Sequence, residues 1–132
     1  MPRRQPVVAV LVAWTAIVWT TRIGNIWRDH TLSHHRKVTA TVLALSFTVL
    51  AVVVLVGWLQ RRGWLLWATL ALGGWTIGVW VVRFAAIVTD GHGAGFVVVH
   101  LVLAIASIGL SIEACRRLWA AAPQVLSADR GE

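Results

Sequence analysis

The chain has 132 residues, of which 58% are hydrophobic and 13% are charged, and its formal net charge is +7. An average soluble domain is roughly 45–50% apolar and about 25% charged, and small domains bury the smallest share of their surface. The composition therefore excludes a water-soluble globule and a disordered chain. It predicts a single integral membrane domain over residues 1–132.

Four apolar runs follow one another along the chain, and each is long enough to cross a bilayer as a helix. A membrane-spanning helix needs about 20 mostly apolar residues, and we place the four spans at about residues 7–27, 38–59, 64–88 and 95–114. Strands are excluded because the runs are too long and four strands cannot close a barrel. The predicted fold class is all-α, an integral membrane four-helix bundle, with a short polar tail at residues 118–132.

Basic residues at the ends of the spans indicate the orientation, since cytoplasmic loops carry the excess of Lys and Arg. With the N-terminus inside, the cytoplasmic side holds Arg3, Arg4, Arg61, Arg62, Arg116, Arg117 and Arg130, and the outer side holds Arg28, Arg36 and Lys37. We therefore expect a multi-pass protein of the cell membrane with both termini in the cytoplasm. The basic residues form short pairs rather than a continuous helical face, so no nucleic-acid partner is expected.

An internal repeat relates the first and third spans. Residues 14–29 and 75–90 align at a shift of 61 and share the pattern W-T-x-x-V-W-x-x-R-x-x-x-I-x-x-D. The chain is therefore predicted to contain two parallel transmembrane hairpin repeats, at about residues 7–62 and 64–117, related by an axis along the membrane normal. At about 100° per residue the shared positions fall within one arc of the helix, so we expect the two repeats to face each other.

The polar residues of this shared face form the candidate functional site. Arg22 and Arg83 each lie one to two turns below the outer end of a span, and an Arg at a span centre costs about 2.5–3.5 kcal/mol. Asp29 and Asp90 follow seven residues later on the same face. One interpretation is a crossed pair of ion pairs, Arg22 with Asp90 and Arg83 with Asp29. The others are snorkelling of both arginines to the outer headgroups and binding of an anion or ligand.

The fourth span carries a histidine on a face of small residues, which lets helices approach closely. His100 is therefore predicted to point at a neighbouring helix, where it forms a hydrogen bond, relays protons or binds a metal. In the third span Gly74 and Gly78 form a GxxxG pair that would pack a partner helix or a second copy of the chain. The small residues of the fourth span are Ala104, Ser107 and Ser111.

Glu113 precedes Arg116 and Arg117 by three and four residues, a spacing that predicts a local ion pair. No cofactor or metal is predicted. His30, His34 and His92 are weak metal candidates because they have no fixed ligand spacing and lie near basic side chains. No catalytic motif is present, and we therefore expect no enzyme.

Residues 19–29 read Trp-Thr-Thr-Arg-Ile-Gly-Asn-Ile-Trp-Arg-Asp. This stretch resembles the short multi-pass membrane proteins of high-GC Gram-positive bacteria. The resemblance implies no site residue and no activity. The predicted function is a non-enzymatic accessory or structural subunit that packs in the lipid bilayer against itself or a larger membrane complex. One alternative is a small transporter or channel for an anion or lipid headgroup that uses Arg22 and Arg83. A second is a metal- or haem-binding membrane module.

Overall fold

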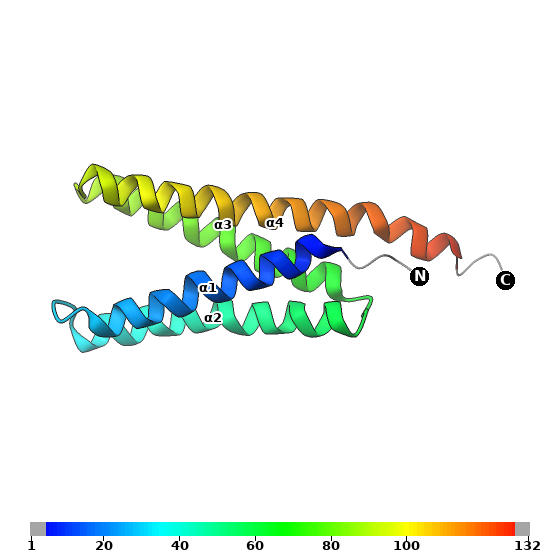
Figure 1. Cartoon of the computed structure of the whole chain (residues 1–132), viewed down its shortest axis with the longest axis horizontal. Helices are drawn as coiled ribbons and strands as arrows, with labels where there is room; N and C mark the ends of the chain where they lie inside the picture. The colour runs from blue at the N-terminus through cyan, green and yellow to red at the C-terminus, as the bar shows by residue number, and fades with distance from the viewer. Residues whose placement is uncertain (1–4, 129–132) are drawn as a thin grey trace.

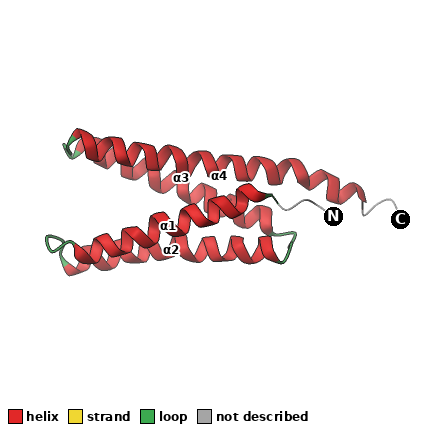
Figure 2. Cartoon of the chain, in the orientation of Figure 1, coloured by secondary structure: helices red, strands yellow, loops and turns green. Residues whose placement is uncertain are grey.

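The computed structural model describes residues 5–128, and within this range the regular structure is entirely helical (Figure 2). Each of the four helices is long and apolar enough to cross a membrane, so the chain is a multi-pass membrane protein of the all-α class. The helices are α1 (Pro6–Arg28), α2 (His34–Leu59), α3 (Leu65–Thr89) and α4 (Ala94–Ala128). Arg3, Arg4 and Arg130 of the predicted orientation lie outside the described residues.

The helix bounds follow the predicted spans closely except at two ends. Helix α2 begins at His34 rather than at residue 38, because Ser33 caps it by accepting a hydrogen bond from the backbone N–H of Arg36. Helix α4 continues to Ala128, through residues that we predicted to form the tail, and Pro123 lies within it. Hydropathy marks the part of a helix that is apolar, whereas a helix itself also extends into polar sequence.

The four helices form an up-down-up-down bundle of two hairpins (Figure 1). The α1–α2 turn at residues 29–33 and the α3–α4 turn at residues 90–93 lie at one end, which we call the turn end, and the α2–α3 turn lies at the other. Helices α1 and α3 run in the same direction. Each of them packs against both α2 and α4, so α1 and α3 lie diagonally across the bundle.

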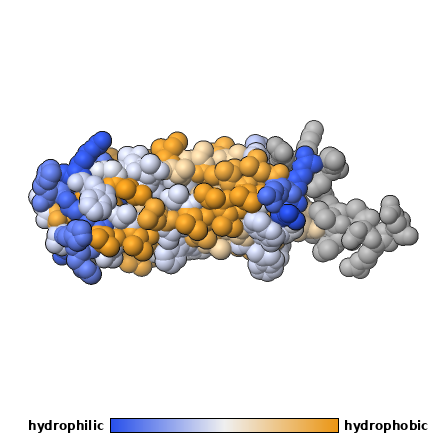
Figure 3. All heavy atoms as spheres, turned by 90° about the horizontal axis from the view of Figure 1, so that it is seen from below, coloured by the Kyte–Doolittle hydropathy of each residue, from blue (hydrophilic) through white to orange (hydrophobic). Residues whose placement is uncertain are grey.

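The core is apolar and centres on an aromatic stack. Phe47 of α2 is fully buried, and its ring lies on that of Trp19 with centroids 3.9 Å apart and an interplanar angle of 11°. On the face seen in Figure 3 a broad apolar band lies between polar residues toward the two ends, as expected of a protein that spans a bilayer. The other core residues are Val8, Leu11, Ala44, Val54, Leu72 and Ala114.

Among the glycines of α3, Gly73 lies against α4, whereas the predicted GxxxG pair does not. A Cβ added to Gly73 would lie 3.3 Å from the Sγ atom of Cys115 and 3.5 Å from the Cβ of Ser111. Gly74 and Gly78 are exposed, and a Cβ on either would meet nothing within 4 Å. These two glycines therefore pack no helix of this chain. The small residues of α4 are buried at helix contacts: Ala104, Ser107 and Ser111.

Candidate functional site

A cleft of about 400 Å³ lies between α1, α3 and α4. Its walls are mainly aromatic and aliphatic side chains, including Trp14, Trp19 and Trp80. Few polar residues reach it, and those that do come from all three helices. The charged or titratable ones are Arg22, Arg83 and His100. The structure thus brings three of the five predicted polar site residues together around one space.

The two arginines are positioned by a contact between the diagonal helices. The rings of Trp19 and Trp80 meet with their centroids 6.5 Å apart, and each arginine follows its tryptophan by three residues, which places it on the same face one turn further on. Arg22 and Arg83 are both half-buried, and their guanidinium groups are near enough to repel each other. The Nε atom of Arg22 is buried and has no hydrogen-bond partner.

The two aspartates lie in the turns, outside the cleft. The Asp29 carboxylate accepts hydrogen bonds from the backbone N–H of Thr31 at 2.9 Å and from its hydroxyl at 2.6 Å. These bonds lower the pKa of Asp29, so the contacts that hold the α1–α2 turn are present at neutral pH and are lost as the pH falls through that lowered value. Asp90 is exposed at the end of α3.

Neither aspartate forms an ion pair with an arginine of the cleft within the described residues, so the crossed pairs do not form there. Asp29 acts on Arg22 only at longer range. The reason is distance along the axis, because each aspartate stands at the C-cap of its helix, seven residues or about 10 Å beyond the arginine of the same helix. The positive charges of the cleft are therefore not neutralised by the carboxylates that the sequence placed on the same face.

His100 faces the arginines from α4. Its Nδ1 atom lies 2.8 Å from the carbonyl oxygen of Phe96, so Nδ1 carries a proton and donates it to that oxygen. The Phe96 ring lies against His100 with centroids 3.9 Å apart and stacks on His92 at 4.6 Å. Phe96 therefore fixes the imidazole ring at the edge of the cleft.

The histidine-rich turns do not assemble a metal site in the part of the chain that the structure describes, where no three His, Cys, Asp or Glu side chains lie close enough to hold an ion. His30 and His34 are exposed, and His34 lies edge-on to Trp27 with ring centroids 6.4 Å apart. His92 lies near the carbonyl oxygen of Ile87, 3.3 Å from its Nδ1 atom.

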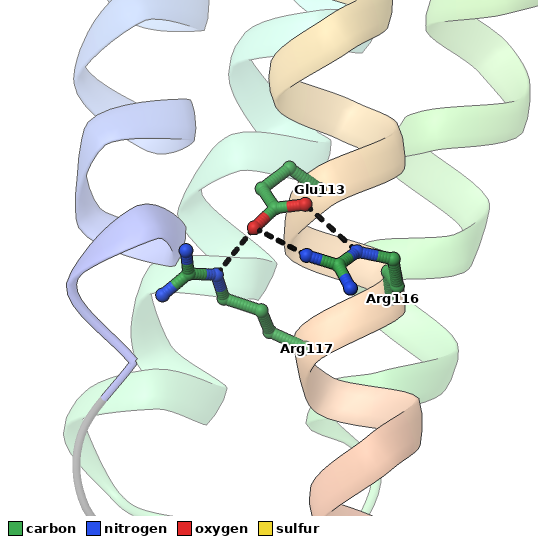
Figure 4. Close-up of polar contacts among 3 residues, drawn as sticks. All are labelled: Glu113, Arg116 and Arg117. Carbon is green, nitrogen blue, oxygen red and sulfur yellow. Dashed lines mark hydrogen bonds and ion pairs between the residues drawn. The ribbon is translucent and has the colours of Figure 1, made fainter.

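The predicted ion pair between Glu113 and the two arginines that follow it on α4 is confirmed (Figure 4). The Nε and Nη2 atoms of Arg116 donate to the two carboxylate oxygens of Glu113 at 2.9 and 3.0 Å, and Arg117 donates through its Nε. All three residues lie outside the cleft lining. This cluster is exposed and contributes little to stability.

Two tryptophan–serine hydrogen bonds connect the hairpins, and the sequence analysis missed both. The indole N–H of Trp14 donates to Ser107 at 2.9 Å, and that of Trp75 donates to Ser46 at 2.9 Å. The donors are 61 residues apart and so are the acceptors. The signal was therefore present in the sequence, but it required comparison of the second and fourth spans as well as the first and third.

Equivalent positions of α1 and α3 are buried alike. Each buried residue of α1 has a buried counterpart 61 residues later in α3: Val8 and Thr69, Leu11 and Leu72, Thr15 and Thr76, Trp19 and Trp80, Ile26 and Ile87.

The cleft lies on the α4 side of the bundle, whereas an aromatic side chain occupies the α2 side. The Phe47 ring fills the space beside Trp19. Within the described residues no α4 ring contacts Trp80, whose indole N–H is buried without a partner.

No protein-family model, curated protein or solved structure matches the chain. The chemistry of the cleft therefore carries the functional argument. Two cations without an ion-pair partner among the described residues line it, and the Nε of Arg22 and the indole N–H of Trp80 are buried without a hydrogen-bond partner.

Proposed function

We propose that this small membrane protein binds an anionic group in the cleft, between Arg22 and Arg83. The observation that carries the proposal is the pair of buried donors without partners, the Nε of Arg22 and the Nε1 of Trp80, on residues that both line the cleft. A buried polar group without a partner costs free energy, and an unpaired charge costs more. An anion supplies the acceptors and the counter-charge through charge-assisted hydrogen bonds.

Other uses of the arginines fit the geometry less well. Structural ion pairs would require the aspartates, and Asp29 is bound to Thr31 instead. Snorkelling would require guanidinium groups that reach the lipid surface at the turn end, whereas the Nε of Arg22 is buried. Helical side chains also lean toward the N-terminus of their helix, which is away from that end.

The accessory-subunit hypothesis remains compatible with an anion site, but it has no specific feature in its favour. The exposed GxxxG pair, Gly74 and Gly78, is weak evidence for a partner. Among the described residues no group of three His, Cys, Asp or Glu side chains favours a metal-binding module. Anion binding is therefore the better-supported function, and transport would further require the cleft to open to each side of the membrane in turn.

We also infer that the chain consists of two equivalent parallel hairpins in the cell membrane, with both termini in the cytoplasm. The matched burial of α1 and α3 and the two Trp–Ser hydrogen bonds support the equivalence. The excess of arginine on the side opposite the turn end supports the orientation. The cleft then lies in the outer half of the bilayer. The resemblance to small membrane proteins of high-GC Gram-positive bacteria agrees with this assignment.

Cysteine labelling tests this topology in a Cys115→Ser background. We expect His30→Cys and Gly93→Cys, one in each turn of the turn end, to react with an impermeant maleimide in intact cells. Gly63→Cys, in the α2–α3 turn, should react only after permeabilisation. All three positions are exposed, and a Cβ on either glycine meets nothing within 4 Å. The reverse pattern would invert the orientation, and different behaviour of residues 30 and 93 would contradict parallel hairpins.

Anion binding is tested with inorganic phosphate and the purified protein in a neutral detergent. We expect phosphate to raise the unfolding midpoint, since a ligand at 100 times its Kd stabilises the folded state by about 2.7 kcal/mol. The Arg22→Gln and Arg83→Gln variants should each lose most of this shift. Arg28→Gln is the matched control, because Arg28 lies on the same helix but is exposed and outside the cleft. A wild-type protein that shows no shift, or a shift that survives in both variants, would contradict the proposal.

A further inference from the structure

The cleft has features that specify its ligand beyond a negative charge. We infer that the ligand is a lipid phosphomonoester whose phosphate lies between Arg22 and Arg83 and whose acyl chains leave the cleft between α1 and α4. This inference rests on the proposed anion site. It further specifies the charge of the bound headgroup and states that the headgroup belongs to a lipid.

The first argument is the number of charges. Arg22 and Arg83 carry two positive charges that repel each other across the cleft, and no carboxylate of the described chain pairs with either. A phosphomonoester carries about −1.5 to −2 at pH 7. A phosphodiester carries a single negative charge and would leave one cation unbalanced in a setting where charge is poorly screened. The monoester is therefore the headgroup that matches the site.

The second argument is the number of acceptors. Arginine presents five N–H donors and the indole of Trp80 presents one. The Nε of Arg22 and the Nε1 of Trp80 are already buried without partners. A phosphomonoester offers three terminal oxygens that accept strong hydrogen bonds, whereas a diester offers two. Three oxygens provide one acceptor for each arginine and a third for the indole.

The third argument is the place where the cleft opens. Ile17 of α1 is 64% exposed and Val99 of α4 is 56% exposed, and both line the cleft. They are apolar and belong to the surface that faces the acyl chains, so the mouth of the cleft opens sideways into the bilayer. A lipid enters such a mouth without leaving the membrane, whereas a soluble anion must first cross part of the apolar region.

The depth of Arg22 and the volume of the cleft agree with a lipid headgroup that lies below the membrane surface. Arg22 lies six residues before the end of α1, which is about 9 Å along the helix axis. A headgroup at this depth loses contact with water, and only a site that replaces its hydration with two cations holds it there. The volume of about 400 Å³ corresponds to roughly a dozen water molecules at about 30 Å³ each. This is more than a phosphate alone needs, and it leaves room for the ester groups beside it.

The test compares three ligands on the wild-type protein in neutral detergent at pH 7.5, using the shift in unfolding midpoint and native mass spectrometry of bound lipid. The ligands are dioleoyl phosphatidic acid, dioleoyl phosphatidylglycerol and glycerol 3-phosphate. We expect the phosphatidic acid to bind at least tenfold more tightly than either of the others. The Arg22→Gln and Arg83→Gln variants should lose this preference for the monoester.

A steric pair of variants locates the acyl chains. Val99→Trp places a bulky ring at the mouth of the cleft, whereas Val98→Trp adds the same ring at a neighbouring position that is 57% exposed and does not line the cleft. We expect Val99→Trp to weaken phosphatidic acid binding at least tenfold and Val98→Trp to leave it within twofold. Equal behaviour of the two variants would overturn the lateral exit of the chains.

The remaining outcomes separate this inference from the proposed function. Equal binding of phosphatidic acid and phosphatidylglycerol, lost in the arginine variants, would overturn the choice of a monoester and retain the anion site. Binding of glycerol 3-phosphate as tight as that of phosphatidic acid would overturn the lipid and retain the anion site. Failure of all three ligands and of inorganic phosphate would overturn both.

Discussion

A protein with glutamine in place of both Arg22 and Arg83 is expected to be more stable than the wild type when no ligand is bound, by about 1–3 kcal/mol. Both guanidinium groups are half-buried, repel each other and lack a carboxylate partner within the described residues. Glutamine keeps hydrogen-bonding capacity and removes the two charges. Unfolding of the purified protein in a phosphate-free neutral detergent measures the difference.

Phosphate should not stabilise the same double variant. In the wild type, by contrast, the bound anion should restore the stability that the two unpaired arginines cost. Arg28→Gln and Arg62→Gln are controls for exposed arginines and should change stability by less than about 0.5 kcal/mol. A double variant that is less stable than the wild type would show that the arginines hold the fold together, and the anion site would then lose its main support.

Replacing Phe47 by alanine is expected to cost about 2–4 kcal/mol of stability. The side chain is fully buried and stacks on Trp19. In a bilayer the transfer of apolar surface contributes little, because lipid is as apolar as the core. The cost therefore comes from the cavity and from lost contacts with surrounding atoms.

Chemical unfolding in detergent measures this loss, and Phe84→Ala is the matched control. Phe84 lies on α3, is half-buried and is not part of the core cluster, so its loss should cost clearly less. Equal costs for the two variants would mean that the stack at Phe47 is not a centre of packing.

The membrane spans and the ion pair of Glu113 were predictable because both depend on local sequence. Length and hydropathy define a span wherever it lies in the bundle, and residues three and four apart on a helix meet whatever surrounds them. The shared face of α1 and α3 also placed Arg22, Arg83 and the two tryptophans on one side of each helix. These features need only the period of the helix.

The failed expectations depend on features that helical periodicity does not contain. The aspartates do not reach the cleft because each stands at a C-cap, about 10 Å along the helix axis from the arginine. The glycine that meets a neighbouring helix of the chain is Gly73, about 100° from Gly74, and the packing of Gly74 and Gly78 against a partner helix or a second copy stays a prediction. The cleft is lined by side chains of α1, α3 and α4, a combination that becomes visible only once the helices are packed.

The distribution of tryptophan allows intrinsic fluorescence to report whether the cleft is occupied. Trp14, Trp19 and Trp80 line the cleft, and the remaining six indoles do not belong to its lining. Filling the cleft changes the polarity around those three fluorophores and leaves the others as a constant background. A lipid brominated on its acyl chain would dim the first group when it occupies the cleft, so occupancy can be followed by emission without attaching a dye.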